Sequence, residues 1–249
     1  GQTDASGSFT ISLQPGTYTV EEEQRQGWSS STPSSVSVQV EAGMTTEVQF
    51  GNYQLGSIAV LKYYDLNLNG HYDDGEAALE GWTITIDDGN GLTLAAVTNS
   101  DGIATFTALP PGHYNVSEQM ESGWYNVTPA SVEVDVGEGE TVEVEFGNAQ
   151  YASLCVVKFN DLNGNGMCDS EDTYLQNWTI EVYDSENQLV ASTVTDSMGC
   201  ADFILKAGTY MVNEVLVPGW QPTTQLPLIV ELMPGQEALR WIGNTQDSY

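Results

Sequence analysis

Thr141-Val-Glu-Val-Glu-Phe146 places an apolar side chain at every second position. The stretches Ser35-Val-Ser-Val-Gln-Val40 and Ser131-Val-Glu-Val-Asp-Val136 alternate in the same way. Successive side chains of a strand point to opposite faces of its sheet, so this period of two predicts half-buried antiparallel strands. Turn sequences such as Pro110-Pro-Gly112 separate them. About seven short strands per repeat, with almost no helical periodicity, predict an all-β fold of β-sandwiches.

Motifs recur at intervals of 96 residues. Gly27-Trp28 returns as Gly123-Trp124 and as Gly219-Trp220. A period of that length is the size of a domain, so it indicates tandem domains and not a solenoid. We divide the chain into an N-terminal part (1–53), a first whole unit (54–149) and a second whole unit (150–249). The N-terminal part corresponds to the second half of a repeat, either incomplete or completed by another chain.

Composition excludes several classes of protein. The 35 acidic and 5 basic residues give a net charge of −30, which argues against binding to nucleic acid or to an anionic membrane. The longest apolar stretches fall short of the ~18–20 residues that a membrane span needs. We find no catalytic nucleophile in a recognisable motif and no phosphate-binding glycine motif, so we do not expect an enzyme. Three cysteines, Cys155, Cys168 and Cys200, allow at most one disulfide within the chain.

A loop in each whole unit has the spacing of a calcium-binding loop. Such loops supply oxygen ligands from positions 1, 3, 5, 9 and 12, a backbone carbonyl from position 7, and a glycine at position 6. The first loop supplies Asp65, Asn67, Asn69, His71, Asp73 and Glu76, with Gly70 at the turn. The second supplies Asp161, Asn163, Asn165, Met167, Asp169 and Asp172, with Gly166 at the turn.

Two matches at equivalent positions predict Ca²⁺ as a structural cofactor, although an Asn- and Gly-rich turn that binds nothing is the alternative. No helix pair is expected to flank either loop, so the predicted role is to rigidify a long connection. Because Asp172 is shorter than Glu76, we expect the second loop to bind more weakly or to recruit another ligand.

Two of the three lysines are set 96 residues apart inside apolar strands. Alternation places Lys62 on the face of Ile58 and Val60, and Lys158 on the equivalent face. By the same rule Glu118 and Asn148 lie on core faces of the first whole unit, and Glu214 and Asn244 on those of the second. Burial disfavours the charged form of a lysine and leaves a nucleophilic amine.

An amine, a protonated carboxyl group and a side-chain amide in a dry core can exchange the amide. Lysine attacks the asparagine carbonyl, glutamate moves the proton, and ammonia leaves, giving an intramolecular Lys–Asn isopeptide bond. Glu118 and Glu214 are the predicted catalytic groups. Two other interpretations remain open: a buried Lys–Glu ion pair with asparagine at a strand end, or a lysine that reaches solvent at the end of the sandwich.

The motifs of this chain resemble the B-type repeats of Gram-positive collagen and serine-aspartate-repeat adhesins. The residues that carry the resemblance are Lys62-Tyr-Tyr-Asp-Leu-Asn-Leu-Asn-Gly70, Gly81-Trp-Thr-Ile-Thr-Ile86, Asp101-Gly102, Leu109-Pro-Pro-Gly-His-Tyr114 and Phe146-Gly-Asn148. The resemblance covers nearly the whole chain. It implies prealbumin-like or immunoglobulin-like sandwiches, an extracellular location at the cell surface, structural calcium and, in a subset of the family, the Lys-Glu-Asn crosslink.

The chain departs from the family pattern at two places. Alternation back from Asn244 reaches Arg240, where the first whole unit has Val144, so we expect a bulge in that strand and a less secure second crosslink. The N-terminal part keeps Glu22 and Asn52 but has no counterpart of the lysine strand or of the calcium loop. A cut array is one explanation, and β-addition of strands from a neighbouring molecule is the other.

The sequence therefore predicts an extracellular structural protein of the cell surface. We expect an elongated array of calcium-stiffened, isopeptide-crosslinked sandwiches that acts as a stalk, a pilus-like filament or a sheath component. Its expected partners are neighbouring copies or repeats of the same surface protein. The alternative function is an adhesive module that binds an extracellular protein or glycan, for which the sequence shows no added loop length.

Overall fold

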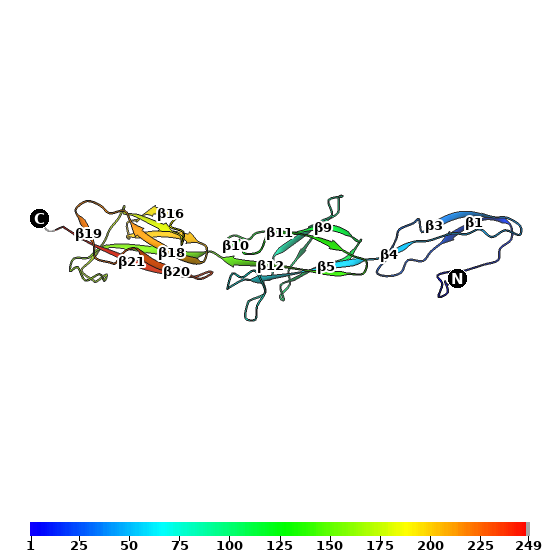
Figure 1. Cartoon of the computed structure of the whole chain (residues 1–249), viewed down its shortest axis with the longest axis horizontal. Coiled ribbons are helices and arrows are strands. Elements are labelled where there is room, and N and C mark those ends of the chain that lie inside the picture. Colours follow the sequence, from blue (N-terminus) through cyan, green and yellow to red (C-terminus); the bar gives the residue numbers. More distant parts are fainter. Residues whose placement is uncertain (248–249) are drawn as a thin grey trace.

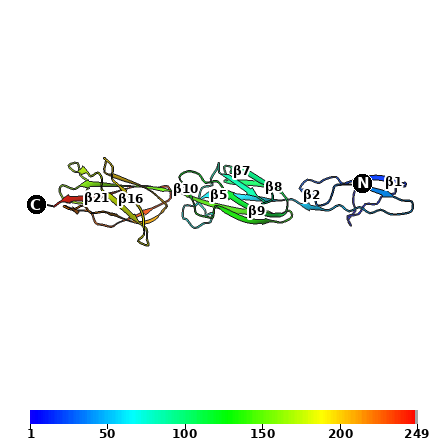
Figure 2. The ribbon, with the colours of Figure 1, turned by 90° about the horizontal axis from the view of Figure 1, so that it is seen from above.

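Strands make up all the regular structure of this protein. The computed structural model describes residues 1–247, and among these no residue lies in a helix. No candidate for a membrane-spanning helix therefore occurs in that range. Three groups of strands lie end to end along one long axis, with the two termini at opposite ends (Figures 1 and 2). The prediction of an all-β, elongated array of sandwiches is confirmed.

The first whole unit consists of two four-stranded sheets, with strand orders β10-β12-β5-β8 and β11-β9-β6-β7. The strands are β5 (Gly56–Tyr64), β6 (Thr83–Asp87), β7 (Thr93–Val97), β8 (Ile103–Leu109), β9 (Gly112–Glu118), β10 (Trp124–Asn126), β11 (Ser131–Val136) and β12 (Thr141–Gln150). The first and last strands, β5 and β12, pair in parallel from Ser57 opposite Thr141 to Tyr64 opposite Asn148. This pairing brings residues 84 positions apart into one sheet.

The second whole unit repeats this topology. One sheet has the order β14-β13-β21-β19 with β17 also paired to β13, and the other has the order β16-β15-β18-β20. The strands are β13 (Ala152–Asn160), β14 (Thr173–Tyr174), β15 (Thr179–Tyr183), β16 (Leu189–Val194), β17 (Cys200–Leu205), β18 (Gly208–Glu214), β19 (Trp220–Pro222), β20 (Leu228–Leu232) and β21 (Glu237–Gln246). Again the first and last long strands, β13 and β21, run parallel.

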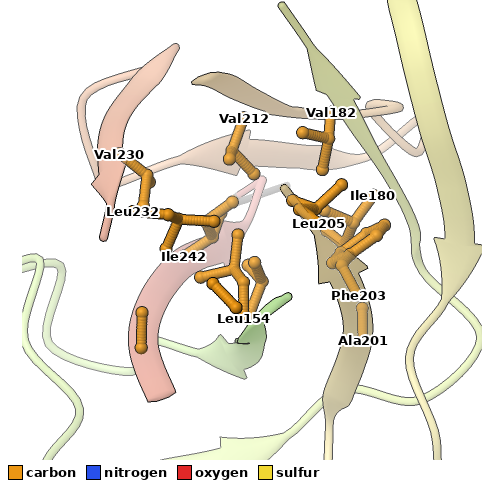
Figure 3. Packing of buried hydrophobic residues seen from close by; sticks show 13 residues of the cluster. Leu154, Ile180, Val182, Ala201, Phe203, Leu205, Val212, Val230, Leu232 and Ile242 are labelled. Carbon is orange, nitrogen blue, oxygen red and sulfur yellow. The ribbon is translucent and has the colours of Figure 1, made fainter. Parts of the chain in front are cut away.

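Each sandwich core forms where the inward residues of both sheets meet. In the second whole unit Leu154 and Ile242 from one sheet face Val182, Val212 and Val230 from the other, and all five are fully buried (Figure 3). Burying an aliphatic side chain of this size contributes about 1.5–3 kcal/mol. The alternation of the sequence therefore sets which residues face the core and which face water.

The N-terminal part contains two separate two-stranded sheets. Strand β1 (Gly16–Glu21) pairs with β3 (Ser35–Val40), and β2 (Trp28–Ser30) pairs with β4 (Asn52–Gln54). The segment before β1 is not in a strand, and its alternating apolar residues are exposed: Phe9 by 52%, Ile11 by 61% and Leu13 by 40%. In the first whole unit the corresponding segment is β8, which pairs with the lysine strand β5.

One local expectation is wrong: β21 has no bulge at Arg240. The pairing of β13 with β21 continues without a register shift through Val156 opposite Arg240 to Asn160 opposite Asn244. Arg240 is half-buried, and its guanidinium donates an exposed hydrogen bond to the carbonyl of Leu239. A long side chain can lay its apolar stem along the core face and keep its charge in water, so the strand needs no distortion.

The two whole units make specific contacts where they meet. The hydroxyl of Tyr125 accepts a hydrogen bond from the backbone N–H of Ala207 at 3.2 Å, and the Lys206 ammonium lies 5.0 Å from the centre of the Tyr125 ring. The ring of Tyr151 lies 5.0 Å from that of Tyr125. Aromatic, cation–π and hydrogen-bond contacts thus define this joint.

Candidate crosslinking sites and metal loops

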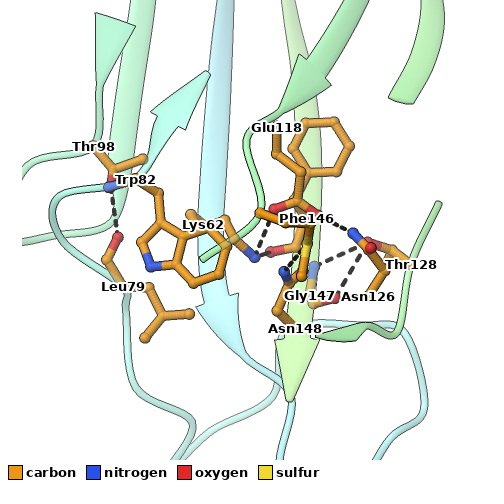
Figure 4. Close-up of polar contacts among 11 residues, drawn as sticks. Lys62, Leu79, Trp82, Thr98, Glu118, Asn126, Thr128, Phe146, Gly147 and Asn148 are labelled. Carbon is orange, nitrogen blue, oxygen red and sulfur yellow. Dashed lines mark hydrogen bonds and ion pairs between the residues drawn. The ribbon is translucent and has the colours of Figure 1, made fainter. Parts of the chain in front are cut away.

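Lys62 lies in the core of the first whole unit. Its position on β5 puts it on the face of Ile58 and Val60, as alternation predicted, and it is fully buried. Its Nζ atom lies 3.1 Å from Oε2 of Glu118 and donates to the carbonyl oxygen of Phe146 at 3.0 Å (Figure 4). The ring of Trp82 covers the ammonium, with 4.4 Å between Nζ and the ring centre.

Burial changes the acidity of both members of this pair. Desolvation lowers the pKa of Lys62 to about 8, although the neighbouring Glu118 carboxylate opposes the shift. Desolvation also raises the pKa of Glu118, against the opposing effect of Lys62. Both shifts favour the neutral forms, a free amine and a protonated carboxyl group.

Asn148 completes the cluster from strand β12. It is fully buried, two residues after Phe146, whose carbonyl accepts the hydrogen bond from Lys62. Its amide nitrogen donates to the sulfur of Met120 at 3.2 Å, and its Oδ1 has no hydrogen-bond partner. The remaining oxygen of Glu118, Oε1, accepts a hydrogen bond from the amide of Asn126 at 2.5 Å. The three residues selected from the sequence therefore lie around one dry site.

The second whole unit holds an equivalent cluster with a closer lysine–asparagine contact. The Nζ of Lys158 lies 3.1 Å from Oε2 of Glu214, donates to the carbonyl of Ile242 at 3.1 Å, and donates to Oδ1 of Asn244 at 2.5 Å. Burial lowers the pKa of Lys158 to about 8, again opposed by its glutamate. Trp178 covers this lysine, with 4.6 Å between Nζ and the ring centre.

The N-terminal part retains two of the three groups. The amide of Asn52 donates to Oε2 of Glu22 at 2.9 Å, and the hydroxyl of Ser30 donates to the other oxygen of Glu22 at 3.0 Å. Strands β2 and β4 bring Ser30 and Asn52 together through their direct pairing. Glu22 and Asn52 thus contact each other, but residues 1–53 contain no lysine that could react with Asn52.

The two covering tryptophans and the two residues that contact Glu118 and Asn148 were not predicted from the sequence. Trp82 and Trp178 are 96 residues apart, and that spacing was the available signal for a shared role. No such signal existed for Met120 and Asn126, because the second whole unit has Leu216 and Pro222 at the equivalent positions.

The first predicted metal loop closes on itself through its own ligand positions. Asp65 is fully buried and accepts hydrogen bonds from the backbone of Asn69 and Gly70. The amides of Asn67 and Asn69 both donate to Oδ2 of Asp73, at 2.8 Å and 2.6 Å. These two hydrogen bonds lower the pKa of Asp73. Gly70 has a φ of 79°, a conformation that a side chain disfavours, so position 6 requires glycine.

Glu76 ends this loop by binding two backbone groups. Its Oε1 accepts from the N–H of Leu66 at 2.9 Å and its Oε2 from the N–H of Asp73 at 3.0 Å. His71, at position 7, contributes its backbone carbonyl in the predicted ligand set and is exposed. The side chains at positions 3, 5 and 9 converge, with the amide nitrogens of Asn67 and Asn69 turned to Asp73 and their amide oxygens accepting from the backbone N–H groups of Asn69 and His71. Each of these side chains carries an oxygen of the kind that calcium prefers.

The second loop reproduces this network with a shorter final acid. Asp161 is fully buried and accepts from the backbone N–H groups of Gly164, Asn165 and Gly166. Asn163 and Asn165 donate to Asp169, as their counterparts donate to Asp73. Asp172 accepts from Leu162 N–H at 3.0 Å and from Asp169 N–H at 2.8 Å. Met167 is exposed at position 7, and Gly166 also has a φ of 79°.

A disulfide joins Cys155 on β13 to Cys200 on β17, and Cys168 is free. The thiol positions of Cys155 and Cys200 also lie near the Asp202 carboxylate, but sulfurs engaged in a disulfide are not thiolate ligands. Cys155, Cys200 and Asp202 are the one group of three histidine, cysteine or acidic side chains within residues 1–247 whose potential ligand atoms all lie within 4.8 Å of one another. The predicted loops rely instead on asparagine oxygens for two positions each.

Sandwich domains in tandem, each with a buried lysine–glutamate pair beside an asparagine, define a class of repeat modules. Each whole unit of this chain matches one family model. Residues 65–150 match the prealbumin-like fold domain SpaA, and residues 152–227 match the SdrD B-like domain. Each whole unit therefore matches a repeat module of the kind that the sequence motifs indicated, and the predicted resemblance to B-type repeats is confirmed.

Curated relatives agree with this assignment. The chain is 28% identical to serine-aspartate repeat-containing protein D of Staphylococcus aureus (strain Newman) over 187 residues, covering 69% of this chain and 14% of the relative. It is 24% identical to serine-aspartate repeat-containing protein F of Staphylococcus epidermidis over 260 residues, covering 89% of this chain and 15% of the relative. The chain thus spans about one seventh of these relatives.

Two solved structures show a limited similarity to this chain. The TIE protein of Bacillus anthracis is 24% identical with a TM-score of 0.42, covering 94% of this chain and 43% of its own. The minor pilin of Streptococcus agalactiae is 16% identical with a TM-score of 0.39, covering 78% of this chain and 97% of its own.

The family assignment places the chain outside the cell, at the cell surface, as predicted. The matched models describe a prealbumin-like fold domain and an SdrD B-like domain, and neither is an enzyme family, as expected. The coarse role that follows from the same relationship is that of a structural, adhesin-like module of the cell surface.

Proposed function

We propose that this chain is a stalk or filament segment of a surface protein, in which a Lys–Asn isopeptide bond closes each whole unit. The observation that carries the proposal is the duplicated cluster of buried lysine, glutamate and asparagine. Burial of a lysine is costly unless its charge is paired or removed, and a covalent bond removes it permanently. The division into the N-terminal part and two whole units is part of this proposal.

The geometry supports one sequence of bond changes. The neutral amine of Lys62 attacks the side-chain carbonyl carbon of Asn148, and the protonated carboxyl group of Glu118 donates a hydrogen bond to the carbonyl oxygen. Glu118 then takes a proton from the attacking nitrogen and delivers one to the leaving amide nitrogen. The new C–N bond replaces the old one, ammonia departs, and Glu118 regains its starting protonation state. Lys158, Glu214 and Asn244 take the same roles in the second whole unit.

The intact mass of the denatured protein tests the crosslinks. Each bond removes one ammonia, so the mass is expected to be about 34 Da below that of the plain sequence, or about 17 Da per unit. Lys62→Ala and Lys158→Ala are each expected to restore about 17 Da relative to the variant's own calculated mass. Lys206→Ala is the matched control, since this lysine is exposed and should leave the full deficit. A mass equal to the plain sequence would exclude both bonds.

We further propose that the two loops hold Ca²⁺. The first would use Asp65, Asn67, Asn69, the carbonyl of His71, Asp73 and Glu76, and the second would use the equivalent atoms from Asp161 to Asp172. Bound calcium would supply positive charge among these oxygens. The chain's own contribution is to bring the ligands together, through the glycine turn and the two backbone hydrogen bonds of the final acid.

The proposed partners are neighbouring repeats or copies of the same surface protein, including a copy that completes the N-terminal part by β-addition. An adhesive function toward a protein or glycan is the alternative. Retention of the purified chain on a glycan or matrix-protein array, without concentration-dependent assembly, would favour adhesion over a stalk or filament.

A further inference from the structure

The two crosslinking clusters differ at two positions beside the reacting groups. Met120 and Asn126 of the first whole unit correspond, 96 residues later, to Leu216 and Pro222. The lysines, glutamates, asparagines and covering tryptophans are the same in both. The clusters therefore form a natural comparison in which only the surrounding contacts change.

In the first whole unit both neighbours hold the reacting groups away from the reactive arrangement. Met120 accepts the hydrogen bond of the Asn148 amide nitrogen at 3.2 Å, while Oδ1 of Asn148 has no hydrogen-bond partner. Asn126 donates to Oε1 of Glu118 at 2.5 Å. Burial raises the pKa of Glu118, and this hydrogen bond opposes that rise because it stabilises the carboxylate, the form unable to donate a proton to the asparagine carbonyl.

In the second whole unit neither constraint exists. Leu216 has no acceptor for the amide of Asn244, and Pro222 has no side-chain donor for Glu214. Among residues 1–247, the amide nitrogen of Asn244 and both oxygens of Glu214 find no hydrogen-bond partner, apart from the ion pair of Glu214 with Lys158. Here the carbonyl oxygen of Asn244 turns to the lysine, at 2.5 Å from Nζ.

We propose that Met120 and Asn126 are positioning residues that slow isopeptide formation in the first whole unit, so that the second unit closes first. The inference rests on the proposed crosslinking function. Met120 acts through the orientation of Asn148, and Asn126 acts through the protonation of Glu118. The order of closure thus follows from two side chains that do not themselves react.

The test measures closure of the two units separately in the full chain. The protein is purified in denaturant, so that it is unfolded at the start, and is then diluted into folding buffer. Samples are quenched with acid at intervals. Peptide mapping of each sample measures the loss of ammonia in each unit. The second unit is expected to close on the order of tenfold faster, because its lysine already contacts the asparagine carbonyl whereas the amide of Asn148 is turned to Met120. The double variant Met120→Leu, Asn126→Ala is expected to remove most of that difference.

Two further measurements separate a positioning role from a general effect on folding. Asn126→Ala is expected to shift the pH profile of closure in the first unit toward higher pH, because Glu118 then stays protonated longer. Leu216→Met, in the other unit, is expected to slow closure there.

Equal closure rates in the two units, or variants that leave both their ratio and the pH profile unchanged, would overturn the inference. Absence of any ammonia loss in either unit would instead overturn the proposed function itself.

Discussion

Replacing Glu118 by alanine is expected to abolish the crosslink of the first whole unit and to lower its free energy of unfolding by about 3–5 kcal/mol. The reason is that Lys62, fully buried, then remains an uncrosslinked amine without the carboxylate 3.1 Å away, so folding must either bury its charge unpaired or remove its proton. Guanidinium unfolding at pH 7 measures the stability, and the intact mass reports the missing bond.

Lys62→Met is the control for this experiment, because it also prevents the crosslink but fills the site with an apolar chain of similar volume. Replacing a buried charge by an apolar isostere is often neutral, so this variant should be clearly more stable than Glu118→Ala. Equal stability of the two variants would show that an unpaired buried charge is not what destabilises Glu118→Ala.

The free energy of unfolding of Glu118→Ala is expected to rise with pH. Desolvation already lowers the pKa of Lys62 to about 8 from the ordinary lysine value of 10.5, and loss of Glu118 removes the interaction that opposes this shift. Between the lowered pKa of the folded state and the ordinary pKa of the unfolded state, the unfolded chain binds more protons, so stability rises with pH. The deficit relative to Lys62→Met should therefore shrink from pH 8 to pH 10.5.

Removal of calcium by a chelator is expected to have the second large effect. A ligand present at a hundredfold excess over its dissociation constant stabilises the folded state by about 2.7 kcal/mol per site, so two loops give roughly 5 kcal/mol. The melting temperature should fall, and an endoproteinase that cuts at aspartate should then cleave within residues 65–76.

Asp65→Ala should remove the calcium response of the first loop, because Asp65 occupies position 1 and is fully buried. Asp74→Ala is the matched control, since Asp74 is exposed in the same loop at a position that supplies no predicted ligand. Calorimetric titration that detects no calcium binding to the unmodified chain would rule out the loops as metal sites.

The period of two in the sequence was sufficient to identify the inward residues. It placed Lys62, Glu118 and Asn148 on core faces, and each is buried in the structure. The reason is that side-chain direction in a strand depends only on position along the chain, so it can be read locally. Because the sequence repeats every 96 residues, the same assignment applies to the equivalent residues of the second whole unit.

Contacts between strands distant in sequence were not predictable in this way. The covering of Lys62 by Trp82 depends on how two sheets pack, and the hydrogen bond from Asn126 to Glu118 depends on how strand β10 lies relative to the end of β9. The prediction of a bulge at Arg240 was wrong because it assumed that a charged residue cannot occupy a core-facing position. A long side chain can reach water from such a position.

The parallel pairing of β5 with β12 has a mechanical consequence for a chain pulled from its two ends. Tension enters the first whole unit at the start of β5 and leaves it at the end of β12, so the two strands are drawn past each other along their length. The hydrogen bonds between Ser57–Tyr64 and Thr141–Asn148 are then loaded in shear, all together, and cannot be opened one pair at a time as in a hairpin peeled from one end. The second whole unit, with β13 and β21 parallel, resists extension by the same geometry.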